Sequence, residues 1–247
     1  MTRPLRVLVA CECSGTVRDA FAALGHDAWS CDLKADERGS NRHMIASVLD
    51  VIAHPEIYGV FDLLAVMHPP CTRLCNSGVR WLDKPAKNPI ADLTPAQAAA
   101  WPNMNDAEKL ALTWSKLDEG AALFDACLNS YIPHVAVENP VMHKHAKARI
   151  RFDGVAPFFV QPWHFGTDEA GPDNEKKRTG FWCKGLPPLQ RTGILDGTTA
   201  RDSVHKASPG KNRATERSRF FPGMASAIAD QWSRHVMAGL MDPARAA

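Results

Sequence analysis

Several features are missing from this sequence of 247 residues, and each absence excludes a class of protein. No apolar run approaches the roughly 20 residues that a membrane-spanning helix needs, so a membrane protein is not expected. The N-terminus lacks the pattern of a signal peptide. The seven cysteines are an odd number and do not indicate a disulfide framework. We therefore expect a cytoplasmic protein with reduced thiols, in the host cytoplasm if a phage encodes it.

Strong net charge is also missing, because 29 Lys and Arg against 27 Asp and Glu leave only +2. This balance by itself does not indicate a nucleic-acid partner. Two basic clusters could nevertheless neutralise phosphates, and the first spans residues 144–151. The second cluster consists of Lys206, Lys211, Arg213, Arg217 and Arg219. An ordinary solvated surface explains the first cluster equally well, whereas we predict that the second faces phosphates.

The pattern of apolar residues predicts an α/β fold in one main domain. Expected strands lie at 6–10, 27–31, 61–67, 135–137, 158–160 and 180–182, and expected helices at 17–24, 107–129 and 224–237. Strands that alternate with helices predict a mostly parallel sheet covered on both faces. The stretch 84–105 is rich in Pro, Ala and Asn and is interpreted as an insertion or mobile loop. Sheets of this kind bind ligands at the carboxyl ends of their strands.

The most informative motif follows the expected strand 61–67 and reads HPPCT at residues 68–72. Its two prolines fix a turn that holds Cys71 just beyond the sheet edge, which suits a nucleophile. An isolated Pro-Cys would instead indicate a small structural cysteine. The flanking Asp62 and the following Ser77 and Gly78 favour the nucleophile.

This motif resembles the nucleophile motif of the DNA cytosine-5 methyltransferases, in which Pro-Pro-Cys follows a strand and precedes a Ser-x-Gly-like segment. A second motif agrees, because Glu138 and Asn139 follow the next expected strand, where that family has Glu-Asn. The resemblance implies that Cys71 adds to C6 of a flipped-out cytosine in DNA. It also implies that Glu138 hydrogen-bonds N3 and the exocyclic amine. C5 becomes nucleophilic only when a thiolate adds to C6 and charge is withdrawn at N3.

The resemblance further implies a Rossmann-like methyltransferase fold that binds S-adenosylmethionine at the ends of the first strands. Residues expected to contact this cofactor are Glu12, Ser14, Gly15, Asp32, Asp50 and Pro69. Asp32 ends the second strand, where an acid binds ribose hydroxyls, and Asp50 is placed to receive the adenine amine. Capping of a helix or strand is the alternative for both acids. The loop 11–15 lacks two of the family's glycines. Zinc is not expected at Cys11 and Cys13, because no second Cys/His pair stands at ligand spacing from them.

Later segments resemble further family motifs. The run Lys177-Arg178 is similar to a basic strand that steadies the target ring, which implies that Arg178 is an orienting cation. The segments 213–217 and 221–223 resemble the family's late Thr-x-Arg-Glu and Phe-Pro elements. The predicted nucleic-acid contacts are Ser77, Lys211, Arg213 and Arg217.

The chain is most similar to small methylase-like proteins of bacteriophages and prophages, with which it shares Ala-Cys-Glu, His-Pro-Pro-Cys-Thr, Glu-Asn-Pro and Lys-Gly-Leu-Pro strings. This implies a catalytic domain at 1–185, then a reduced recognition segment and a C-terminal helix packed back on it at 186–247. Full-length family members carry a sizeable target-recognition domain. Its reduction here predicts relaxed sequence specificity, and the sequence does not indicate an oligomeric state.

Three alternatives stay open at this point. The substrate could be a cytosine nucleotide or RNA, or a group other than methyl could be transferred to C5. A degenerate homologue could also bind DNA or cofactor without turnover. Intact Cys71 and Glu138 favour catalysis, whereas the lost glycines favour the degenerate protein. His68 replaces a small residue of the family and either contacts the cofactor or fills space.

Overall fold

The computed structural model describes residues 3–90, 92–206 and 220–241, and its central feature is one seven-stranded sheet. The strands are β1 (Arg6–Ala10), β2 (Asp27–Asp32), β3 (His43–Ile45), β4 (Leu63–Val66), β5 (His134–Glu138), β6 (Pro157–Val160) and β7 (Thr179–Lys184). Their order is β3-β2-β1-β4-β5-β7-β6, and β7 runs antiparallel to both of its neighbours. The first five strands are parallel, in the order of a doubly wound sheet. The predicted Rossmann-like α/β fold with a mostly parallel sheet is thereby confirmed.

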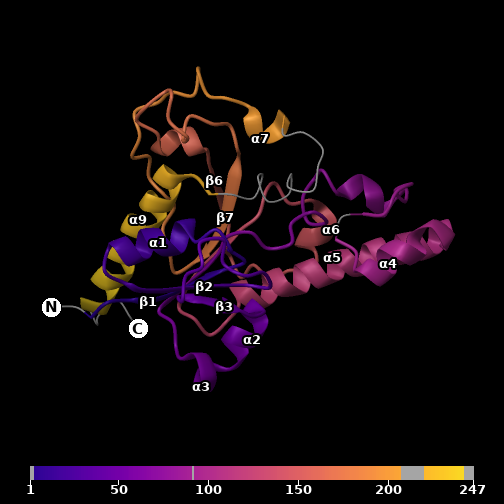
Figure 1. Cartoon of the computed structure of the whole chain (residues 1–247), viewed down its shortest axis with the longest axis horizontal. Coiled ribbons are helices and arrows are strands. Elements are labelled where there is room, and N and C mark those ends of the chain that lie inside the picture. The colour runs from indigo at the N-terminus through magenta and orange to yellow at the C-terminus, as the bar shows by residue number, and fades with distance from the viewer. Residues whose placement is uncertain (1–2, 91, 207–219, 242–247) are drawn as a thin grey trace.

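Helices cover both faces of this sheet (Figure 1). They are α1 (Thr16–Ala23), α2 (Val48–Ala53), α3 (Pro55–Tyr58), α4 (Pro95–Ala100), α5 (Asp106–Leu128), α6 (Lys144–Lys147), α7 (Ser203–Lys206) and α9 (Pro222–Met241). Short 3-10 turns form η1 (Val79–Leu82), η2 (Trp101–Asn103) and η3 (Pro162–Phe165). Among the helices that the structure describes, none is long and apolar enough to cross a membrane.

The two hydrophobic cores follow from the alternation of side chains along the strands. Val7 and Val9 of β1 face the core that α1 and α9 complete, with Phe21 and Trp232 fully buried in it. The intervening residues of β1 face the core formed with α2 and α5. Both faces are therefore apolar, which explains why the central strands read as continuous hydrophobic runs.

The sequence predicted all strands except β3, which has only three residues. The segment 84–105 differs from the expected loop, because it contains α4, whose Thr94 and Gln97 form a capping box. Trp101 in the same segment is fully buried, and its indole N–H donates to the carbonyl of Ala86 at 3.2 Å. Residues 84–105, apart from the undescribed residue 91, thus form a folded insertion beside the start of α5 (Figure 1).

Asp62 was expected to flank the reactive cysteine, but it lies at the opposite end of β4. Its carboxylate accepts the backbone N–H of Arg6 at 2.8 Å and both terminal nitrogens of Arg3 at 2.8 and 2.6 Å. Because these contacts join the amino ends of β1 and β4, Asp62 stabilises the start of the sheet and takes no part in a site at its carboxyl edge.

Candidate active site

The loop that carries Cys71 leaves the carboxyl end of β4 and folds at once into a tight turn. The carbonyl of Cys71 accepts the N–H groups of Leu74 at 3.0 Å and Cys75 at 3.1 Å. A second turn follows, in which the Gly78 N–H donates to the Cys75 carbonyl at 2.9 Å. A Cβ at Gly78 would lie 2.0 Å from the carbonyl oxygen of Thr72, so only glycine fits there. The turn therefore holds Cys71 in one backbone position, and the residue as a whole stays partly exposed.

Backbone hydrogen bonds join this loop to the segment that follows β5. The N–H of Asn76 donates to Val141 at 3.0 Å, and the N–H of His143 donates to Leu74 at 3.1 Å. The His143 Nε2 donates to the carbonyl of Arg73 at 2.6 Å, while Nδ1 accepts an N–H from the first turn of α6. These two bonds require a neutral ring, and burial accordingly lowers the pKa of His143. The loops after β4 and β5 are thus clamped to each other.

This clamp brings Cys71 together with Glu138, the last residue of β5, which is only 6% exposed. Burial raises the pKa of Glu138 from 4.5 to about 7, against the lowering effect of the positive charge of Lys177. Burial also raises the pKa of Cys71 to about 12, and the charge of Glu138 adds to this increase. Lys177 acts on the thiol in the opposite direction. The three groups therefore form one electrostatic unit.

Arg178, the cation expected in the site, does not join this unit. Its side chain is exposed, and its guanidinium lies over the ring of Phe159 at 4.2 Å. Lys177 is partly buried instead and lowers the pKa of Cys71, Glu138 and His68. Adjacent residues of an extended segment point to opposite sides, so the structure brings only the first residue of the pair to the site.

A second wall of the site comes from Phe220 in the C-terminal part of the chain. The sequence did not predict a role for this residue. Phe220 is buried and lies 5.0 Å from the ring of His68, measured between centroids. The ammonium of Lys177 lies 5.6 Å from the centre of the same phenyl ring. Burial and Lys177 lower the pKa of His68 well below its usual value, so its imidazole is neutral. Its Nε2 has no hydrogen-bond partner among the described residues.

The loop after β1 is organised by Glu12, whose side chain is fully buried. Its carboxylate accepts the N–H groups of Val17 at 2.8 Å and Arg18 at 3.3 Å, and the hydroxyl of Ser14 at 3.1 Å. These N–H groups belong to the first turn of α1, where dinucleotide-binding folds place a pyrophosphate. Because a carboxylate of the chain itself occupies this position, the loop fits a cofactor that brings no phosphate there.

Gly15 has a structural reason for being glycine. Its φ of +69° is in the left-handed region, and a Cβ would lie 2.2 Å from Nη2 of Arg18. Arg18 is itself buried, donates to Ser30 Oγ at 2.9 Å and pairs with Asp36. The pairing, together with backbone hydrogen bonds, lowers the pKa of Asp36 to about 2 although burial opposes this. Gly15 therefore makes room for a buried ion pair under the loop.

Two acids stand at the same edge of the sheet. Asp32 ends β2, is partly exposed, and accepts the N–H of Lys34 with one carboxylate oxygen at 2.9 Å. Asp50 is exposed in the first turn of α2, directly after β3. Since β1, β2 and β3 are adjacent and parallel, both carboxylates lie at the edge that carries the Glu12 loop. Carboxylates accept hydrogen bonds from hydroxyl and amino groups, so this pair fits the ribose and adenine of S-adenosylmethionine.

The other predicted contacts are distributed differently. Pro69, two residues before Cys71, is buried. Ser77 is exposed, and its hydroxyl lies 2.9 Å from the sulfur of Cys75. Lys211, Arg213 and Arg217 lie outside the described residues. Within the described ranges, no group of three His, Cys, Asp or Glu side chains could hold a metal ion.

Comparisons with known proteins find similarity among solved structures. No protein-family model matches the sequence, and no curated protein matches it. Among solved structures, the chain is similar to the methyltransferase EhMeth of Entamoeba histolytica, with 12% identity and a TM-score of 0.43. The alignment covers 85% of this chain and 62% of that one, so the chain spans less than two thirds of that methyltransferase. A similarity of this degree does not identify a function, which has to come from the geometry of the site.

Proposed function

We propose that this chain is an S-adenosylmethionine-dependent methyltransferase that modifies C5 of cytosine in DNA, with Cys71 as its nucleophile. The observation that carries the proposal is the clamped pair of Cys71 and Glu138 at the ends of β4 and β5. It places a partly exposed cysteine beside a buried carboxyl group whose pKa is about 7. Addition to the cytosine ring needs these two groups, a nucleophile and an acid that protonates the ring.

The sulfur of Cys71 forms a bond to C6 of the target cytosine, and Glu138 in its acid form donates its proton to N3. The electron pair released by this addition makes C5 nucleophilic. S-adenosylmethionine, when bound, supplies an electrophilic methyl group. Solvent water then takes up the C5 proton, which restores the C5–C6 double bond as Cys71 leaves as the thiolate, and N3 returns its proton to Glu138.

The electrostatics of the site support this sequence of steps. Ionised Glu138 raises the pKa of Cys71, whereas the positive charge of Lys177 lowers it. When Glu138 is protonated its negative charge no longer acts on the sulfur, whereas burial still raises the pKa of Cys71 and Lys177 still lowers it. The protonation state that can protonate N3 is therefore also the state that favours the thiolate. Lys177 takes the orienting role that the sequence motif suggested for Arg178.

We propose that the cofactor and the target base bind at different parts of the carboxyl edge of the sheet. The Glu12 loop with Ser14 and Gly15 shapes the cofactor side, where Asp32 and Asp50 would hold the ribose and adenine. C6 of a base stacked in a duplex cannot be reached by a side chain, so the target cytosine is flipped out of the duplex. We also propose that the chain is related to the small methylase-like proteins of phages and prophages, on the motifs quoted above.

The test is covalent trapping with DNA that contains 5-fluorocytosine, in which the fluorine at C5 blocks the release of Cys71. The wild-type protein with S-adenosylmethionine should form an adduct that survives denaturation, and Cys71→Ala should form none. Cys183→Ala is the matched control, because burial raises the pKa of Cys183 to about 12 as it does for Cys71. An adduct in Cys71→Ala would refute the nucleophile. An adduct on RNA or a nucleotide but not on DNA would refute the proposed substrate.

A further inference from the structure

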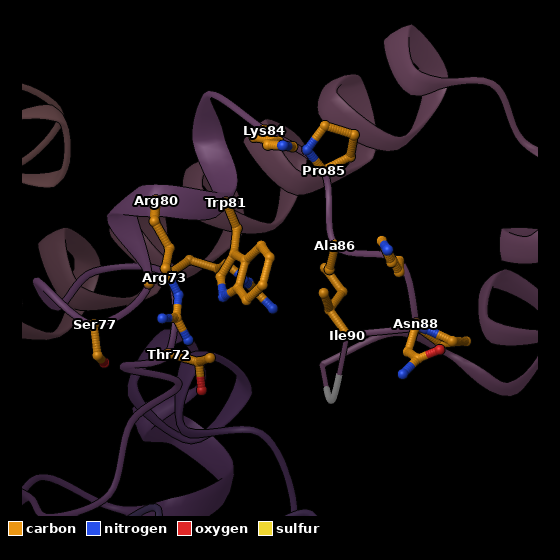
Figure 2. A pocket seen from close by; sticks show the side chains of 13 residues that line it. Thr72, Arg73, Ser77, Arg80, Trp81, Lys84, Pro85, Ala86, Asn88 and Ile90 are labelled. Atoms are coloured by element: carbon orange, nitrogen blue, oxygen red, sulfur yellow. The ribbon is translucent and has the colours of Figure 1, made fainter.

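A groove of about 790 Å³ opens beside the Cys71 loop (Figure 2). Thr72, the residue that directly follows Cys71, forms part of its lining. One wall comes from Arg73, Arg80 and Trp81, and Ile90 of the insertion stands across the opening (Figure 2). The groove therefore lies between the Cys71 loop with η1 and the folded insertion, and it begins one residue from the proposed nucleophile.

The lining of the groove carries positive charge. Its charged side chains are Arg73, Arg80, Lys84 and Lys87, and no acidic residue lies among the described lining residues. Arg73 is paired with Asp92, which binds Nε at 2.9 Å and Nη2 at 2.8 Å. The other three cations are exposed. Such a surface attracts an anion, and phosphate groups are the anions that clustered Lys and Arg bind in nucleic acids.

Two details show that the groove is organised before a ligand arrives. The side chain of Arg73 is only 4% exposed, yet its Nη1 has no hydrogen-bond partner among the described residues. A buried N–H without a partner costs free energy, so a ligand oxygen that came within reach of Nη1 would stabilise the site. Trp81 adds an aromatic surface, with the guanidinium of Arg80 at 4.6 Å from its ring centre. Aromatic and guanidinium planes are the surfaces on which unpaired bases stack.

We propose that this groove holds the nucleotide next to the target cytosine on the same strand. Its base stacks on the surface that Trp81 and Arg80 form, and its phosphate meets Arg73, Lys84 and Lys87. This inference rests on the proposed function, because it takes the target base to be at Cys71. The groove would then contact the base adjacent to the target cytosine. This contact would add to the sequence recognition that the short recognition segment provides.

The experiment is an equilibrium binding titration without cofactor, in which no methyl transfer occurs. Dye-labelled oligonucleotides carry one cytosine, and an abasic site replaces in turn each of the two neighbouring nucleotides. We expect the abasic site on one side to weaken binding about tenfold, as the loss of one stacked base does. Arg80→Ala and Trp81→Ala should weaken binding of the intact oligonucleotide to a similar degree and remove the sensitivity to the abasic site.

The matched control is Arg42→Ala, since Arg42 also lies over a tryptophan, Trp29, at 5.0 Å. It pairs with Asp27 at the amino end of β2, away from the groove, so this variant should bind as the wild type does. Trp81→Phe should restore most of the affinity lost in Trp81→Ala. If Trp81→Ala fails to fold, binding of the intact and abasic oligonucleotides to the wild type and to Arg80→Ala still tests the proposal, because Arg80 is exposed.

The two proposals fail in different ways. If the 5-fluorocytosine adduct forms but neither the abasic sites nor Arg80→Ala changes affinity, the groove does not hold the neighbouring nucleotide, and the nucleophile stands. If no adduct forms but an abasic site weakens binding and Arg80→Ala removes that effect, the groove assignment stands without the chemistry.

Discussion

Replacing Glu138 with glutamine should stabilise the protein at alkaline pH. Glu138 is buried at the end of β5, and burial raises the pKa of its carboxyl group from 4.5 to about 7. A carboxyl group with a raised pKa in the folded state favours folding only while it is protonated. That contribution is complete below pH 4.5 and is lost as the pH rises through about 7, because ionisation is easier in the unfolded chain.

The magnitude follows from the two pKa values. Between 4.5 and about 7, at about 1.4 kcal/mol per pH unit, the folded state of the wild type loses roughly 3 kcal/mol. Glutamine has nearly the same shape and does not ionise, so Glu138→Gln avoids this loss. The variant should therefore be more stable than the wild type by roughly 3 kcal/mol at pH 8.5 and about equal to it below pH 4.5.

The assay is urea unfolding of both proteins at pH 4.5, 6.0, 7.0 and 8.5 (chosen around the two values), with the exposed Glu169→Gln as control. The difference in unfolding free energy should grow with pH for Glu138→Gln and stay flat for Glu169→Gln. A difference that is the same at all four pH values would refute the argument, because the carboxyl group would then not titrate differently in the folded and unfolded states.

Three further predictions concern the remaining parts of the site. His143→Ala should lower the melting temperature and slow the formation of the 5-fluorocytosine adduct at least tenfold, because the clamp between the two loops loses its side-chain bond; equal adduct rates would contradict the clamp. Lys177→Met should shift alkylation of Cys71 by iodoacetamide to higher pH, whereas Arg178→Met should leave the pH profile unchanged. S-adenosylmethionine should raise the melting temperature, and Asp32→Ala should remove most of that increase, whereas an undiminished increase would exclude the ribose contact.

The sequence allowed the core of the candidate site to be predicted because that core depends on local order along the chain. Cys71 follows the apolar strand β4 and Glu138 ends the apolar strand β5, and the carboxyl ends of neighbouring parallel strands meet at one edge. Two prolines before the cysteine marked the end of its strand. The strand positions and these two residues therefore needed no knowledge of distant contacts.

The parts that could not be predicted depend on contacts between distant segments. Which of Lys177 and Arg178 points toward Cys71 depends on the backbone direction of the residues before β7. The Lys-Arg sequence is compatible with either orientation. Phe220 reaches His68 only because α9 returns to pack against α1, far away in sequence. The fold of the insertion depends on the burial of Trp101. The composition of residues 84–105, rich in Pro, Ala and Asn, indicated a loop instead.

The buried carboxylate of Glu12 bears on which small molecules can compete for the loop after β1. Abundant adenosine compounds in a cell, such as ATP and NAD, share adenine and ribose but carry phosphates. Glu12 already accepts the first N–H groups of α1, so a phosphate there would find these donors occupied. The sulfonium group of the proposed cofactor needs no such donors. If the proposed cofactor binds here, the loop would discriminate against adenosine compounds that place a phosphate at this helix end, before any side chain reads their shape.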